Sequence, residues 1–177
     1  LNVRAILTNA VPTRPDGKGG MAPCETWDNA TLLCEAEATD GKRFPLTLKC
    51  QRIAPGELNT WYFEIKGMRA SARFSTRDPQ CFELLEFVDG RQEWRRVSTG
   101  YTPTFPTITG GIFEFGFTDA IQQMWAAFID ELAGGDAGGF PCATPQEAAA
   151  HHAVLTAALL AGKGNQVVTV NYARGGA

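Results

Sequence analysis

The residue types that most often carry acid–base or nucleophilic chemistry are sparse in this chain. The only histidines, His151 and His152, are adjacent in a helix-like segment. Neighbouring helical side chains point about 100° apart, so these two cannot bind one metal ion together. No serine lies in the Gly-x-Ser-x-Gly turn of the esterases. The sequence therefore predicts no catalytic residue within this chain.

Cysteines and acidic residues could bind a metal, but their spacing does not favour it. The five cysteines are scattered and form no Cys-x-x-Cys pair, so we predict no zinc site. Cys34, Cys50 and Cys81 fall in strand-like segments, where buried free thiols in a reducing cytosol are expected. Glu35 and Glu37 share one strand face, and such a pair suits a solvated surface better than a catalytic site.

Charge and hydropathy exclude several classes of partner. The net charge is −3 and no basic run is present, so we expect no nucleic-acid partner. No apolar run approaches the ~20 residues of a membrane span, and no signal peptide is visible. A cytoplasmic protein without a membrane partner is expected. A Gly-x-Gly-x-x-Gly fingerprint is also absent, so we expect this chain to bind no dinucleotide by itself.

Hydrophobic periodicity places most of the chain in strands. Alternation between residues 29 and 98 predicts a meander of about seven strands with hairpin turns at Asp40-Gly41 and Asp89-Gly90. Two long helices are expected near 118–133 and 145–161. The sequence therefore predicts an α+β fold, in which a mainly antiparallel open-faced sheet carries both helices on one face. We expect one domain over residues 1–177.

The closing helix has the clearest local signals. Thr144 is the predicted N-cap, Pro145 occupies the first helical position, and Glu147 completes a capping box. Gly162 and Gly164 are expected to supply the left-handed turn that ends the helix.

Several segments resemble the C-terminal part of Gfo/Idh/MocA oxidoreductases. The most similar is Gly-Phe-Thr-Asp-Ala-Ile-Gln-Gln-Met-Trp-Ala-Ala-Phe-Ile-Asp-Glu-Leu at 116–132, followed by Ala-Thr-Pro-Gln-Glu-Ala at 143–148 and a valine-rich strand. Trp-Asp-Asn-Ala at 27–30, followed by Asp40-Gly41, resembles the strand and glycine turn of the family's sheet domain. Gly67 stands where the family often has a junction between strands.

The resemblance implies a division of labour with a domain that this chain lacks. In the family, an N-terminal Rossmann domain binds NAD or NADP and precedes a Lys-Pro motif and a catalytic histidine. This chain has no Lys-Pro pair and no histidine before His151. It begins with Leu1 rather than Met, which we take to indicate a fragment or a processed product. By resemblance, residues 1–177 form the C-terminal domain that shapes the substrate pocket and makes dimer contacts.

The activity implied for the parent protein is an NAD(P)-dependent dehydrogenase of a sugar, polyol or related compound. The sequence cannot choose between NAD and NADP, because the selecting residue would lie in the absent domain. The alternative is a stand-alone binding or dimerisation module without enzymatic activity.

Three residues are candidates for contact with a small-molecule substrate. Trp27 and Tyr101 come from two long irregular loops, and loops of such length tend to be functional or mobile. Glu114 lies where some subfamilies carry a His-Pro-Glu-Gly-type motif before the penultimate helix. The matching stretch here, Phe-Glu-Phe-Gly at 113–116, keeps the glycine and lacks the histidine. Glu114 is therefore either a substrate contact or a solvated loop carboxylate.

Apolar residues interrupt the outward polar pattern of the strands, and contiguous apolar patches mark interfaces. The family's sheets also commonly pack face to face. We therefore predict a two-fold homodimer through the open sheet face. The residues expected in that contact are Leu33, Tyr62, Leu85 and Phe87.

Overall fold

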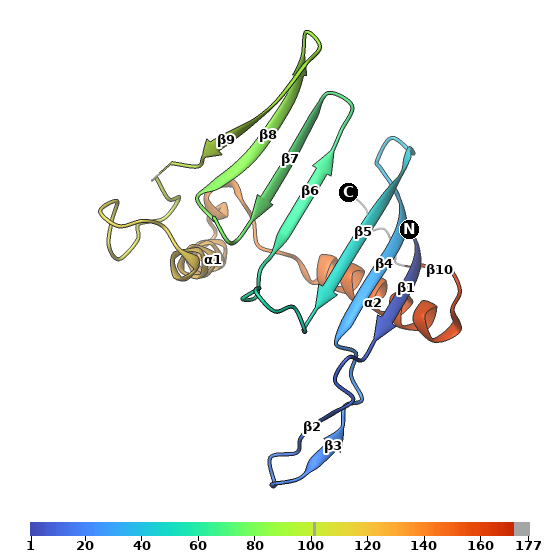
Figure 1. Cartoon of the computed structure of the whole chain (residues 1–177). Coiled ribbons are helices and arrows are strands. Elements are labelled where there is room, and N and C mark those ends of the chain that lie inside the picture. The colour runs from blue at the N-terminus through green and yellow to red at the C-terminus, as the bar shows by residue number, and fades with distance from the viewer. Residues whose placement is uncertain (101, 172–177) are drawn as a thin grey trace. The chain divides into compact units, whose positions relative to one another are not determined.

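The computed structural model describes residues 1–100 and 102–171, and it confirms the α+β class with antiparallel sheets (Figure 1). The chain divides into two compact units. The first unit combines Leu1–Gly56 with the chain from Ala143 onward, and the second is Glu57–Cys142. Each unit has its own four-stranded sheet. The predicted strands thus form two separately paired sheets, divided near the Pro55-Gly56 break.

The sheet of the first unit has the order β10-β1-β4-β5, and every neighbouring pair is antiparallel. Asp40-Gly41 connects β4 to β5 as predicted, and Gly41 has a φ of 80°. Pro45 lies in β5 at the sheet edge, where its missing N–H costs no ladder bond. The strands are β1 (Asn2–Thr8), β4 (Asn29–Glu37), β5 (Arg43–Gln51) and β10 (Val168–Thr169).

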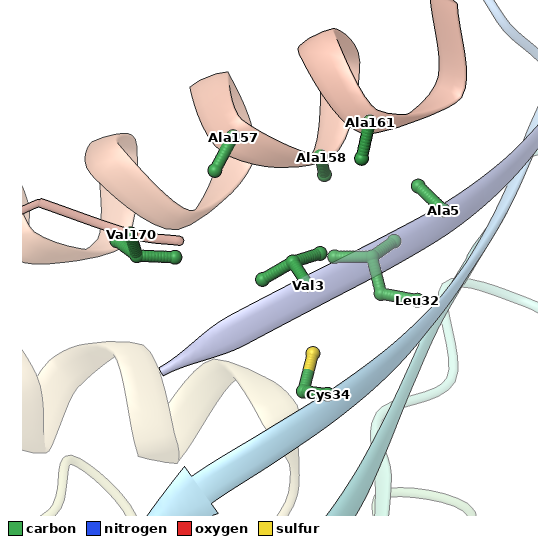
Figure 2. Packing of buried hydrophobic residues seen from close by; sticks show 8 residues of the cluster. All are labelled: Val3, Ala5, Leu32, Cys34, Ala157, Ala158, Ala161 and Val170. Atoms are coloured by element: carbon green, nitrogen blue, oxygen red, sulfur yellow. The ribbon is translucent and has the colours of Figure 1, made fainter. Parts of the chain in front are cut away.

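Helix α2 (Pro145–Gly164) lies on β1 and covers one face of this sheet. The predicted cap is confirmed, because the Thr144 hydroxyl accepts from the Glu147 N–H at 3.2 Å and the Glu147 carboxylate accepts from the Thr144 N–H at 2.7 Å. Figure 2 shows the core that results, in which small helical side chains face apolar strand residues. Its buried members are Val3, Ala5, Leu32, Cys34, Ala157, Ala158, Ala161 and Val170.

The expected role of the two glycines in ending α2 is wrong. The helix continues through Gly164, and the left-handed residue is Asn165, with a φ of 46°. Gly162 has a different function, because a Cβ at this position would lie 2.5 Å from Cδ1 of Leu7 on β1. The glycine therefore leaves room for the Leu7 side chain, which is a long-range requirement that no local pattern reveals.

A short hairpin of β2 (Thr13–Pro15) and β3 (Met21–Pro23) extends from the end of the first unit's sheet (Figure 1). We call residues 9–27 the arm. Asp16 organises its tip, because its Oδ1 accepts from the N–H groups of Lys18 at 2.7 Å and Gly20 at 2.9 Å. The long loop expected here is therefore a two-stranded projection with a hydrogen-bonded tip.

The second unit has the strand order β6-β7-β8-β9, again antiparallel throughout. The predicted Asp89-Gly90 hairpin is confirmed, with φ values of 50° and 75°. Both values are positive, as a type I′ turn requires. The strands are β6 (Tyr62–Lys66), β7 (Ala70–Ser75), β8 (Cys81–Val88) and β9 (Arg91–Ser98).

The strand register of this unit sorts its side chains onto two faces, since directly paired residues point the same way. One face, which we call the apolar face, has at its centre Phe63, Ile65, Phe74, Phe82, Leu84 and Val97. The other, which we call the charged face, has at its centre Glu64, Arg73, Glu83 and Arg96, with Tyr62, Ser75 and Cys81 beside them.

The second unit also contains α1 (Phe117–Leu132) and a short 3₁₀ turn, η1 (Ala137–Gly139). The N-cap of α1 is Gly116, and the Asp119 carboxylate accepts from the Gly116 N–H at 2.8 Å. Both predicted long helices therefore exist, and each belongs to a different unit. The large apolar side chains of α1 all stay at least a third exposed: Phe117, Ile121, Met124, Trp125, Phe128, Ile129 and Leu132.

Candidate functional site

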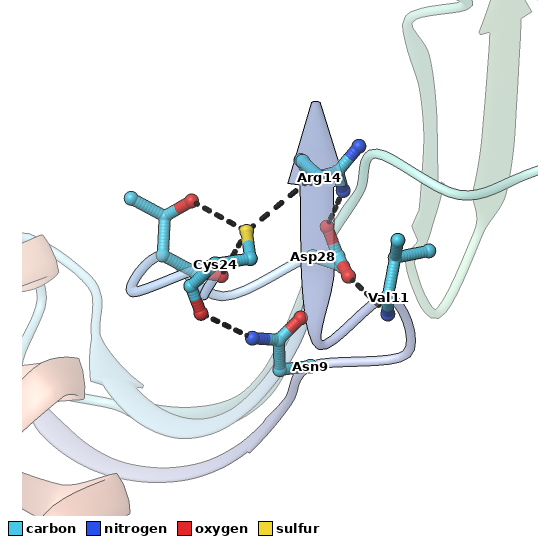
Figure 3. Close-up of polar contacts among 6 residues, drawn as sticks. Asn9, Val11, Arg14, Cys24 and Asp28 are labelled. Atoms are coloured by element: carbon cyan, nitrogen blue, oxygen red, sulfur yellow. Dashed lines mark hydrogen bonds and ion pairs between the residues drawn. The ribbon is translucent and has the colours of Figure 1, made fainter. Parts of the chain in front are cut away.

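A buried carboxylate fixes the base of the arm. Asp28 is only 2% exposed, and its Oδ2 accepts from the Val11 N–H at 2.8 Å. Its Oδ1 forms an ion pair with the Arg14 guanidinium (Figure 3). These donors, Val11 first and then Arg14, lower the pKa of Asp28 against the opposing effect of burial. The carboxylate thus stays ionised and ties the arm to the start of β4.

The same arginine contacts a cysteine. The Arg14 Nε donates to the Cys24 Sγ at 3.2 Å, and the Thr26 hydroxyl lies 3.5 Å from that sulfur (Figure 3). Thr26 first, and Arg14 next, lower the pKa of Cys24. Asn9 completes the cluster, since its Nδ2 donates to the Cys24 carbonyl at 2.6 Å. The arm base is therefore held by polar contacts on both of its strands.

Sequence reasoning missed this cluster, although it had noted Asp28 as part of a motif. Arg14 lies 14 positions before Asp28, and no helical or strand periodicity connects them. The cysteines also differ from expectation. All five are free, as predicted, but among the three strand cysteines only Cys34 is buried, whereas Cys50 is exposed. Burial raises the pKa of Cys34, so Cys24 and Cys34 differ in the direction of their pKa shifts.

The substrate candidates lie in separate parts of the molecule. Trp27 belongs to the first unit, directly before the buried Asp28, and is 45% exposed. Glu114 is exposed in the second unit, and its Oε2 accepts from Gln80 Nε2 at 3.4 Å. Tyr101 lies outside the described residues. That these residues share one substrate site therefore stays a prediction.

The charged face of the second unit is hollowed. The hollow has a volume of about 400 Å³, and its charged lining consists of two arginines and two acids. Arg73 donates to Glu83 twice, from Nε at 2.6 Å and from Nη2 at 3.1 Å. Arg96 forms an ion pair with Asp78. The remaining lining residues are Tyr62, Phe74, Ser75, Cys81 and Phe82.

An aromatic ring supports one of these pairs. The Arg73 guanidinium carbon lies 4.4 Å from the centre of the Trp94 ring, a cation–π contact. The hydrogen bonds from Arg73 lower the pKa of Glu83. Arg73, Glu83 and Arg96 lie on three different strands. Only the register between strands shows that they meet.

The residues predicted for a dimer contact fall in both units. Tyr62, Leu85 and Phe87 share the charged face of the second unit, and Tyr62 and Phe87 are 60% and 51% exposed. Leu33 lies on β4 of the first unit and is 51% exposed. Their participation in an interface stays a prediction.

Among residues 1–100 and 102–171, no group of three His, Cys, Asp or Glu side chains is placed to hold a metal ion. The described helices include none of the length and apolarity that crossing a membrane requires. His151 and His152 are exposed on α2.

Comparisons with known proteins identify the fold. No family model and no curated protein matches the sequence. Among solved structures, levoglucosan dehydrogenase in complex with NADH and L-sorbose matches with a TM-score of 0.76 and 20% identity, over 97% of this chain and 45% of its own. An NAD binding oxidoreductase from Klebsiella pneumoniae matches with a TM-score of 0.71 and 16% identity, over 97% and 46%.

A third match is not described as an enzyme. The transcriptional regulator Gal80p from Kluyveromyces lactis matches with a TM-score of 0.57 and 15% identity, over 96% of this chain and 40% of its own. The chain thus spans less than half the length of each of these proteins. The resemblance to Gfo/Idh/MocA-type oxidoreductases is confirmed as a likeness of fold.

Proposed function

We propose that this chain is the C-terminal, substrate-shaping part of an NAD(P)-dependent oxidoreductase that acts on a sugar, polyol or related compound. The observation that carries the proposal is the fold match to levoglucosan dehydrogenase, which includes nearly all of this chain but under half of that enzyme. The remainder of such a protein would supply the Rossmann domain, the nicotinamide cofactor and the catalytic residues. This chain would supply walls of the substrate pocket.

The full reading frame provides the first test. We expect a Gly-x-Gly-x-x-Gly strand–turn–helix and a Lys-Pro motif upstream of Leu1. The full protein should then reduce NAD⁺ or NADP⁺ with one or more members of a panel of anhydrosugars, sugars and polyols. The chain of residues 1–177 alone should bind no NADH in calorimetry. Micromolar binding of NADH by this chain, or a frame without a dinucleotide-binding segment, would contradict the proposal.

A regulatory or binding module is the second candidate, and the match to a transcriptional regulator favours it. In that case the full protein would lack dehydrogenase activity with every substrate of the panel. The two candidates are separated by an assay of cofactor reduction in the full protein, with a known dehydrogenase as the positive control.

Trp27 and Glu114 are the described residues that we assign to substrate contact, together with Tyr101 on the basis of sequence. In the full enzyme, Trp27→Ala and Glu114→Gln should raise KM, because each removes a surface or charge that would face the substrate. Glu25→Gln, an exposed neighbour of Trp27 on the arm, serves as a control and should leave KM unchanged. Unaltered kinetics in both test variants would remove these residues from the pocket.

We also propose that the protein forms a two-fold homodimer through the open sheet faces. Support comes from the exposed side chains of Tyr62 and Phe87 on one face, with the partly buried Leu85 beside Phe87 on the same strand face, and from the exposed Leu33 in the other unit. Phe87→Glu should shift sedimentation from dimer toward monomer. Val88→Glu is the matched control, since Val88 is 58% exposed and its side chain points to the opposite face. A wild-type protein that sediments as a monomer at micromolar concentration would end this proposal.

A further inference from the structure

Trp27 lies in a short segment between two strands. Strand β3 ends at Pro23 and β4 begins at Asn29, so residues 24–28, which we call the Trp27 segment, belong to neither. A side chain that contacts a substrate contributes most when its position is fixed before binding, because less ordering cost then offsets the contact. Contacts other than strand pairing must therefore hold this segment.

Arg14 contacts both ends of the Trp27 segment. Its Nε donates to the Cys24 Sγ at 3.2 Å, and its Nη2 pairs with Oδ1 of Asp28 (Figure 3). Cys24 is the first residue of the segment and Asp28 is the last. A guanidinium is planar and its N–H donors have a fixed geometry. One rigid group therefore sets the separation of the two ends between which Trp27 lies.

The Asp28 end is bound to three further parts of the chain. The Asp28 N–H donates to the Thr8 carbonyl at 3.0 Å, and the Asp28 carbonyl accepts from the Arg52 N–H at 2.7 Å. Its Oδ2 accepts from the Val11 N–H at 2.8 Å. The Asp28 side chain has no solvent exposure, and breaking an ion pair there would leave a buried charge without its partner. This end of the segment is therefore firmly fixed.

The Cys24 end is bound to the first half of the arm. The Cys24 N–H donates to the Pro12 carbonyl at 2.8 Å, and the Cys24 carbonyl accepts from Asn9 Nδ2 at 2.6 Å. The Cys24 Sγ also lies 3.6 Å from the carbonyl oxygen of Thr26, the residue before Trp27. The contacts of Arg14 thus join two ends that are each anchored by their own backbone.

We propose that Arg14 is a positioning residue, which holds both ends of the Trp27 segment and thereby fixes Trp27 for contact with the substrate. The substrate contact rests on the function proposed above, whereas the holding of the segment does not. Lysine cannot replace Arg14 here, because its ammonium is a compact point charge and lacks the fork of donors that contacts Cys24 and Asp28 together.

The position of Trp27 is tested by its NMR signal in the full protein labelled with fluorotryptophan, assigned by its absence from Trp27→Phe. Arg14→Lys should shift and broaden this signal, because the segment loses its common contact. Arg43→Lys is the matched control, since it alters an exposed ion pair with Glu35 in the same unit, and it should leave the signal unchanged. An unchanged signal in Arg14→Lys, or the same change in both variants, would overturn the proposal.

The contact with substrate is tested by a double-mutant cycle in the full enzyme. Arg14→Lys should raise KM severalfold with little change in kcat, as the loss of a binding contact does. In a Trp27→Ala background the same substitution should raise KM no further, since the residue through which Arg14 acts is gone. Arg43→Lys should leave KM unchanged in both backgrounds. Additive rises from Arg14→Lys and Trp27→Ala would overturn the proposal, because a general structural role acts in either background.

A second variant breaks the same ion pair from its other side. Asp28→Asn keeps the shape of the side chain and removes its charge, so it should change the Trp27 signal as Arg14→Lys does. A Trp27 signal unchanged by Asp28→Asn would overturn the proposal.

Failure of this inference is distinguishable from failure of the proposed function. A full protein that is inactive with every compound of the panel contradicts the proposed function and the substrate contact of Trp27, while the Trp27 signal still decides whether Arg14 holds the segment. An active enzyme whose Trp27 signal is unchanged in Arg14→Lys keeps the proposed function and overturns the role of Arg14.

Discussion

The two units bury their apolar residues in different ways. In the first, alanines of α2 lie directly on β1, and Val3 and Ala161 are fully buried. In the second, only Ala137 is buried among the described residues, while Phe63 and Ile65 on the apolar face are 50% and 62% exposed. The first unit thus completes its core with its own chain. The second leaves large side chains of its apolar face half or more exposed.

Side-chain size explains part of this difference. Alanine and glycine on α2 let the helix approach the sheet closely, so small residues are enough to exclude water. The residues of the second unit are large, and α1 contributes bulky side chains such as Trp125 and Phe128, which pack edge to face with ring centres 6.0 Å apart. The Trp125 side chain is 56% exposed and that of Phe128 is 43% exposed. The comparison predicts that similar substitutions will have unequal effects in the two units.

The largest expected effect is a charge at the helix–sheet contact of the first unit. Ala161→Asp places a carboxylate at a position with no solvent exposure, where an unpaired charge costs several kcal/mol or more. We expect the first unit to lose its cooperative unfolding transition in circular dichroism. Leu160→Asp is the control, because Leu160 is 53% exposed and should tolerate the charge. A folded Ala161→Asp protein would show that the contact is looser than described.

The next largest effect is the difference in lost stability between side-chain truncations in the two sheets. Leu32→Ala, at a position 5% exposed, should lower the free energy of unfolding by about 2–5 kcal/mol. Ile65→Ala, at a position 62% exposed, should lower it by less than about 1 kcal/mol, since little apolar area is lost. Denaturant titration with hydrogen exchange in each unit measures both values. Equal losses would mean that Ile65 is covered in solution, and the contrast would fail.

A smaller effect is expected where Gly162 of the helix leaves room for the Leu7 side chain. Gly162→Ala places a Cβ against Leu7, and such overpacking costs about 1–3 kcal/mol. Gly164→Ala is the matched control on the same helix, since its Cβ would meet only the flexible Gln166 side chain. Because alanine favours helix, this control should be more stable than the wild type by about 0.5–1 kcal/mol. Thermal unfolding measures both variants: the melting temperature should fall in Gly162→Ala and rise in Gly164→Ala.

The smallest effect concerns pH and the arm. The folded pKa of Asp28 is lowered, so its stabilisation is present above the ordinary value of about 3.9 and is lost as the pH falls through the lower folded value. Asp28→Asn should have a lower melting temperature than the wild type at neutral pH, and the gap should narrow in acid. Asp40→Asn, at an exposed ion pair, should show a smaller gap. If the difference in melting temperature between Asp28→Asn and the wild type widens in acid, the lowered pKa assigned to Asp28 is contradicted.

Much of the local structure was predictable because short-range interactions determine it. The capping box of Thr144 and Glu147 and the Asp89-Gly90 turn each involve residues a few positions apart, and both form as predicted. The candidate sites were less predictable. Arg73, Glu83 and Arg96 come from three different strands, and no local pattern shows that they share one hollow.

The sequence by itself determined the classes of element and their turns, since these follow from backbone preferences and periodicity. Only the tertiary structure decided that the strands pair in two sets, that Asp28 is buried beside Arg14, and that Gly162 is required by Leu7. Each of these depends on groups that are distant in the chain and come together only on folding. A local pattern carries no information about such a partner, because many pairings satisfy the same alternation.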